Sequence, residues 1–98
     1  MKSYLGIANT GVNQATGVAS AGAALPVDSA GQLPKFVRVA VTADTYFRFG
    51  QGGVPTAVAT DLLITPGHPV VLQTNGRTHF AVLQVTAAGV AVVTPLEN

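Results

Sequence analysis

Two arginines and a tyrosine are the side chains of this sequence best suited to recognising a partner. Arg38 lies in the segment KFVRVAVTA, and Tyr46 and Arg48 lie in the segment TYFRFG that follows it. Both segments alternate like strands, and alternate residues of a strand point to one side of a sheet. Arginine and tyrosine are enriched at protein interfaces. We therefore expect these three residues to form an interface, with an ordinary solvated sheet face as the competing interpretation.

Residue types that carry catalysis are present without the spacing that catalysis needs. The chain has no cysteine, and no serine lies in a G-x-S-x-G elbow; the serines are Ser3, Ser20 and Ser29. The glycine-rich stretch 50–53 is not followed by Gly-Lys-Ser/Thr, so it predicts a turn rather than a phosphate-binding loop. No catalytic residue is assigned, and we expect a protein that is not an enzyme.

The histidines and acids also lack partners at ligand spacing. His68 stands in a Pro/Gly turn and His79 within a strand pattern, so neither is assigned to a metal. The four acids lie beside expected turns or near the end of the chain and are typical of turn-forming residues; they are Asp28, Asp44, Asp61 and Glu97. No metal and no cofactor is expected.

Composition limits the classes of partner. The chain has 98 residues, of which 48% are hydrophobic and 9% charged, with a net charge of +1. Ordinary domains carry about 25% charged residues, and a nearly uncharged surface tends to associate. The five bases are scattered, which argues against nucleic acid. No run approaches the ~20 apolar residues of a membrane span, and MKSYLGIANTG lacks the apolar block of a signal peptide, so we expect neither membrane insertion nor Sec export.

From Leu33 onward the pattern is that of short strands separated by turns. KFVRVAVTA and TYFRFG predict a hairpin, and a three-residue loop at 43–45 gives it one apolar face and one face with Arg38, Tyr46 and Arg48. TAVATDLLIT predicts one or two short strands. Asn75-Gly76 predicts a type I′ turn in a second hairpin, in which Leu72 faces His79. VAVVTP predicts the last strand.

These strands indicate an all-β fold, and the segment before them has a different composition. Seven or eight short strands without a helix are typical of a small β-sandwich or jelly-roll-like barrel. We expect residues 1–98 to be one β domain, with the sandwich body at 33–98. Residues 9–31 are small and nearly uncharged, with glycines that interrupt any helix. We interpret residues 1–31 as an extended arm or as irregular strands.

The body of the chain resembles a group of short virion proteins of tailed bacteriophages. The resemblance rests on FVRVAVTADTYFRFG, the Ala-Thr-Asp turn region at 59–63, ITPGHPVVL and THFAVLQV, and covers residues 36–96. It implies a compact all-β unit that acts as a capsid cement or decoration protein. Its implied partners are the major capsid protein and further copies of itself in a dimer or trimer, at the capsid surface after assembly in the host cytoplasm. The group has no catalytic residues, so none is transferred.

Three functions follow from these observations. The first is a cement or decoration protein that binds over joints between major capsid subunits. The second is a head–tail connector or tail component, which differs in copy number. The third, of another class, is a module that binds a glycan or host surface through the loops at 50–56 and 66–69.

Overall fold

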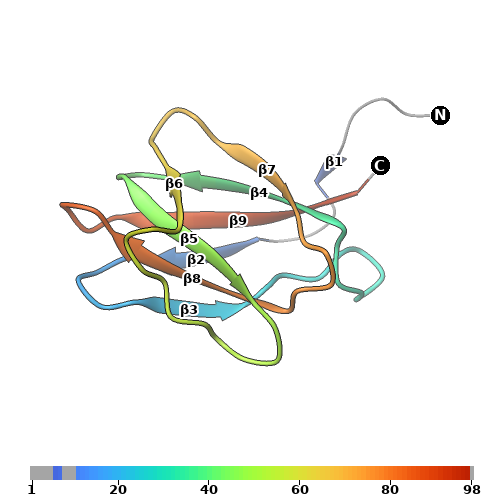
Figure 1. Ribbon diagram of the computed structural model, residues 1–98. Helices are drawn as coiled ribbons and strands as arrows, with labels where there is room; N and C mark the ends of the chain where they lie inside the picture. The colour runs from blue at the N-terminus through green and yellow to red at the C-terminus, as the bar shows by residue number, and fades with distance from the viewer. Residues whose placement is uncertain (1–5, 8–10, 98) are drawn as a thin grey trace.

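The computed structural model describes residues 6–7 and 11–97 (Figure 1). Within these residues it contains nine β-strands and no helix, which confirms the all-β prediction. The strands are β1 (Gly6–Ile7), β2 (Val12–Ala15), β3 (Ala21–Ala24), β4 (Phe36–Val41), β5 (Thr45–Gly50), β6 (Leu62–Ile64), β7 (Val70–Gln73), β8 (His79–Gln84) and β9 (Val90–Glu97).

The strands form two antiparallel sheets that pack face to face. Sheet A has the order β1–β9–β4–β7, with β2 also paired to β9, and sheet B has the order β3–β8–β5–β6. Successive strands cross from one sheet to the other, except at β1–β2 and β5–β6. The rows β2–β9–β4–β7 and β3–β8–β5–β6 have the strand order of an eight-stranded jelly roll, a double-sheet architecture with two Greek keys.

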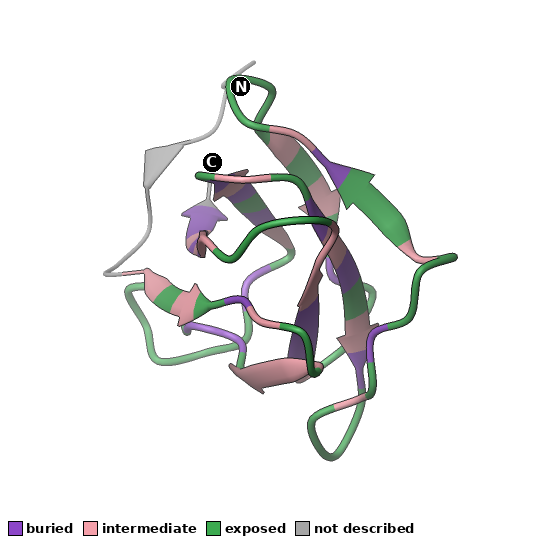
Figure 2. Ribbon diagram, turned by 90° about the vertical axis from the view of Figure 1, so that its left-hand side faces the viewer, coloured by how far each residue is buried: buried purple, intermediate pink, exposed green. Residues whose placement is uncertain are grey.

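The core lies between the sheets and follows from the alternation along each strand. Val37, Val39 and Val41 of β4 are buried against Phe47 of β5 and Phe80 of β8. The rings of Phe47 and Phe80 stack with centroids 5.6 Å apart. Buried residues alternate with less buried ones along some of the strands in Figure 2, and they do so along β4. The period-2 pattern therefore identified correctly which side of β4 and of β5 faces inward.

The predicted hairpin of KFVRVAVTA and TYFRFG is wrong. β4 pairs with β7 and β9 in sheet A, whereas β5 pairs with β6 and β8 in sheet B. The connection at 42–44 crosses between the sheets, so the valines of β4 and the phenylalanines of β5 meet across the core instead of side by side. Both arrangements bury the same side chains, and for that reason the alternation did not distinguish them.

The Asn75-Gly76 turn was predicted correctly, and the hairpin around it was not. Asn75 and Gly76 have φ values of 52° and 78°, and the Arg77 N–H donates to the Thr74 carbonyl at 3.0 Å, as a type I′ turn requires. The turn nevertheless links β7 of sheet A to β8 of sheet B. Leu72 accordingly lies opposite Val37, and His79 lies opposite Gly50 and Ala24.

The small-residue segment near the N-terminus supplies strands of the sandwich. β2 pairs with β9 at one edge of sheet A, and β3 pairs with β8 at one edge of sheet B. We interpreted this segment as either an extended arm or irregular strands. Residues 12–15 and 21–24 form strands. Residues 1–5 and 8–10 lie outside the described residues. The segment TAVATDLLIT contributes only β6, and the remainder belongs to the loop before it.

Candidate interaction surfaces

The three residues of the predicted interface do not lie together. Arg38 projects from the outer face of sheet A, in register with Thr94 of β9 and Val71 of β7. Tyr46 and Arg48 project from the outer face of sheet B, on the opposite side of the sandwich. The predicted grouping is wrong because it depended on the β4–β5 hairpin. Tyr46 and Arg48 still share one face, since they are two residues apart on one strand.

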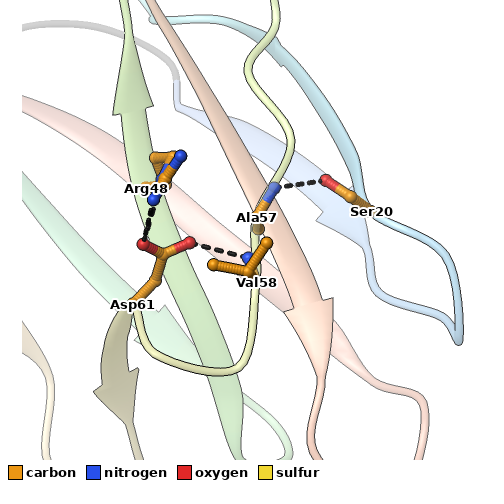
Figure 3. A network of polar contacts seen from close by, with 5 residues as sticks. All are labelled: Ser20, Arg48, Ala57, Val58 and Asp61. Carbon is orange, nitrogen blue, oxygen red and sulfur yellow. Dashed lines mark hydrogen bonds and ion pairs between the residues drawn. The ribbon is translucent and has the colours of Figure 1, made fainter.

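Arg48 holds the loop that joins β5 to β6. Its Nε and Nη2 both lie 2.9 Å from Oδ1 of Asp61, and the second carboxylate oxygen of Asp61 accepts the Val58 N–H at 2.7 Å (Figure 3). The Arg48 side chain remains 44% exposed, whereas that of Asp61 is 11% exposed. The Asp61 carboxylate is thus engaged on both oxygens, and Arg48 has a structural role in fixing the loop.

The same loop, residues 51–61, lies over the outer face of sheet B. The Ala57 N–H donates to Ser20 Oγ at 2.8 Å, just before β3 (Figure 3). Near the other end of the loop, the Gly52 N–H donates to Thr78 Oγ1 at 2.8 Å. Ala57 is buried, and so is Ala81 of β8, although Ala81 pairs with Arg48 of the outward-facing row. Sheet B therefore has its outer face covered in part by its own chain.

Close packing of this loop depends on a glycine at the end of β5. A Cβ at Gly50 would lie 2.6 Å from Cδ of Pro55, which is too short for ordinary packing. Gly50 also accepts the Thr78 N–H at 3.0 Å through its carbonyl. The glycine-rich stretch that was expected to form a turn thus lets the loop fold back onto the strand.

The outer face of sheet A is open and almost uncharged. Ala15, Val71, Gln73 and Asn13 are exposed, and Val90, Val92 and Thr94 are half-buried. Among the outward-facing strand residues with described side chains, Arg38 is the single charged one. No hydrogen bond or ion pair joins Arg38 to another residue of the described ranges. This face therefore carries one cation, on the inner strand β4.

The two loops considered for glycan binding lie at opposite ends of the sandwich. The loop 65–69 follows β6 and adjoins the end that carries the 42–44 connection, because Ile64 pairs with Thr45 at the start of β5. Residues 51–53 follow the far end of β5 and bond to Thr78. The loops 50–56 and 66–69 therefore do not build one site.

The remaining polar residues have structural surroundings. Asp28 Oδ1 accepts the N–H groups of Ala30 and Gln32, both at 2.9 Å, as expected for a turn-forming aspartate. The Thr78 hydroxyl lies 2.7 Å from Nδ1 of His79, and His68 is exposed. Over residues 6–7 and 11–97, no three metal-binding side chains gather at one place. Ser3 and the Glu97 side chain fall outside the described part.

A shallow depression of about 370 Å³ lies where the 25–35 connection meets the Asn75-Gly76 turn. Its lining is Leu33, Pro34, Lys35, Gln73, Thr74, Asn75 and Gly76. The Thr74 hydroxyl donates to the Pro34 carbonyl at 2.7 Å, so the most buried polar group of the lining is already satisfied. No helix in the described part of the chain is long and apolar enough to cross a membrane.

Comparisons with protein-family models, with curated proteins and with solved structures find no match to this chain. These comparisons do not link it to the virion proteins of tailed phages. The resemblance of residues 36–96 therefore remains an expectation from the sequence.

Proposed function

We propose that this chain is a structural virion protein, a cement or decoration protein that docks on the shell of a tailed phage by the outer face of sheet A. The observation that supports the proposal is the contrast between the two outer faces. Sheet B is covered in part by the 51–61 loop, whereas the outward-facing strand residues of sheet A with described side chains include one charge, Arg38.

A sheet face with a single charged residue suits docking against a folded protein. Val90 and Val92 are half-buried, and covering the rest of their side chains would contribute about 25 cal/mol of binding free energy per Å² of apolar area. A stable site on a shell needs on the order of 1,000 Å² of total buried surface. Arg38 then requires a carboxylate on the partner, because an unpaired buried charge is costly.

The jelly-roll strand order is compatible with this role without determining it. Viral capsid proteins, lectin domains and cupins all use jelly rolls, so the fold is shared by several functional classes. The proposal depends on the chemistry of the sheet A face and on the sequence resemblance. The major capsid protein is the partner it implies.

Copy number in purified phage particles from the source tests the role directly. Mass spectrometry scaled to the major capsid protein should give hundreds of copies per particle. Six or twelve copies would replace the cement assignment with a connector or tail component. Absence from the particles would overturn the virion role.

Charge substitutions test the docking face. Shells that lack the protein should bind the wild type and the Val18→Glu variant equally, because Val18 is 88% exposed on a loop between β2 and β3. The Val92→Glu and Arg38→Glu variants should bind at least tenfold more weakly, since each adds an acid to the sheet A face. Equal binding of all four proteins would show that the outer face of sheet A is not the docking surface.

A further inference from the structure

One long side of the sandwich is lined with exposed apolar side chains. Sheet A ends there with β7 and sheet B ends with β6 (Figure 1). Leu62 and Leu63 of β6 are 46% and 49% exposed, and Val71 of β7 is 53% exposed. Neither strand contains a charged residue or a proline. Charged residues and prolines are among the devices that keep sheet edges from pairing with other chains, and both are absent from these two strands.

The apolar surface continues around the edge from one sheet to the other. Leu62 lies opposite Phe47, whose ring is buried, so Leu62 is on the inward-facing side of β6. Leu63 is on the outward-facing side with Tyr46, and Val71 is on the outer face of sheet A beside Arg38. Leu62 therefore extends the hydrophobic core to the surface at this edge. The outward-facing Leu63 and Val71 are exposed beside it.

The backbone of β7 offers hydrogen-bonding groups along this edge. The Thr74 N–H donates to the Lys35 carbonyl at 2.9 Å, one step beyond the Gln73–Phe36 pair. Hydrogen-bonded and non-hydrogen-bonded pairs alternate in an antiparallel ladder. Val71 and Gln73 accordingly direct their N–H and C=O groups away from β4, and β7 has no second neighbour among the described strands.

We propose that this edge is a homodimer interface, in which β7 pairs antiparallel with β7 of a second copy and the β6 leucines of the two copies pack together. An antiparallel pair of identical strands is closed by a two-fold axis and needs only self-complementarity. An apolar edge without charge meets that requirement. A foreign chain with charged residues would lose their hydration here and find no countercharge on β6 or β7.

The position of Arg38 favours this arrangement over the stacking of two sheet A faces. Face-to-face stacking would bury two Arg38 side chains near one another. In the edge-to-edge dimer each Arg38 lies one strand inside β7, so three strand spacings, about 14 Å, separate the two β4 strands. That separation exceeds the screening length of about 8 Å at physiological salt. The sheet A faces of both copies also remain free.

The inference gives a location to the self-association that the virion resemblance implies, and its test uses the purified chain alone. Sedimentation velocity of the full chain from micromolar to near-millimolar concentration should show a monomer–dimer equilibrium. Val71→Lys should raise the dimer dissociation constant about a hundredfold or more, because each copy would bring a lysine onto the new β7–β7 strand pair. Val18→Lys makes the same chemical change at a loop position and should leave the dimer intact.

Three outcomes would overturn the proposal. They are a monomer at every concentration, a Val71→Lys variant that dimerises as well as Val18→Lys, and a Val92→Lys variant that dissociates while Val71→Lys does not. Circular dichroism verifies that each variant is folded, and Leu63→Lys takes the place of Val71→Lys if that variant is not. Particle copy number is measured separately, so failure of the dimer and failure of the virion role are distinguishable.

Discussion

Thr16 and Gly89 hydrogen-bond to each other reciprocally although they are 73 positions apart in the chain. The Gly89 N–H donates to Thr16 Oγ1 at 2.8 Å, and the Thr16 N–H donates to the Gly89 carbonyl at 2.8 Å. Next to this pair, the Val90 N–H donates to Thr42 Oγ1, also at 2.8 Å. Two threonines thus tie the β2–β3, β4–β5 and β8–β9 connections into one end of the sandwich.

Replacing Thr16 with valine should lower the free energy of unfolding, because it removes the hydroxyl that accepts the Gly89 N–H. Valine keeps the shape of the buried side chain but leaves the Gly89 N–H without its partner, which costs about 1–3 kcal/mol. Thr16→Ser retains the hydroxyl and loses one methyl group, so we expect a loss of about 1 kcal/mol. Urea unfolding measures both variants, and a Thr16→Val protein as stable as the wild type would contradict the role of this bond.

Gly22 should be the least replaceable residue of the small N-terminal strands. A Cβ at this position would collide with the carbonyl oxygen of Phe80 and lie 2.8 Å from the Cα of Ala81, both on the neighbouring strand β8. Gly22→Ala therefore forces the β3 and β8 backbones apart, and we expect a loss of about 1–3 kcal/mol or more.

Gly17 provides the matched control, because a Cβ there meets nothing within 4 Å. Gly17→Ala should change the free energy of unfolding by no more than about 0.5 kcal/mol. The two variants are compared by thermal unfolding under one set of conditions. If they lower the melting temperature equally, the close approach of β3 and β8 does not limit the residue at position 22.

Asp61 should matter more than Arg48 for the order of the 51–61 loop. Asp61→Ala removes both the ion pair and the acceptor of the Val58 N–H, whereas Arg48→Ala leaves the second contact in place. The pair is partly exposed, so its loss should cost no more than about 1 kcal/mol of global stability.

The local effect on the loop is the sharper readout. Thermolysin cleaves beside apolar residues, and Val54 and Val58 are exposed in this loop. Cleavage within 51–61 should be fastest in Asp61→Ala, intermediate in Arg48→Ala and slowest in the wild type. Faster cleavage in Arg48→Ala than in Asp61→Ala would show that the carboxylate is not the anchor.

The fold class was predictable from sequence because alternation reports which side of a strand is buried. Val37, Val39 and Val41 were assigned to one apolar face, and they are buried. Alternation does not report which strands pair. The short connections at 42–44 and 74–78 fit a hairpin within one sheet or a crossing between two, and here they cross.

The candidate site was less predictable, because it depends on pairing. Tyr46 and Arg48 share a face as expected, but Arg38 lies on the other sheet. The contact of Arg48 with Asp61 joins residues 13 positions apart, and no pattern in the sequence indicates it. Leu62 and Leu63 carried a signal that was missed, since two adjacent leucines in a three-residue strand cannot both face the core.

The central position of β8 and β9 in the two sheets bears on when this chain can fold during its synthesis. Apart from β4–β7 and β5–β6, every strand pair of the described sheets includes β8 or β9, which are synthesised after the other described strands. Until residues 79–97 emerge, β2 and β3 have no partner strands, and the valines of β4 have no β9 beside them. We therefore expect folding to wait until these residues have been translated, with apolar segments of the nascent chain exposed until then.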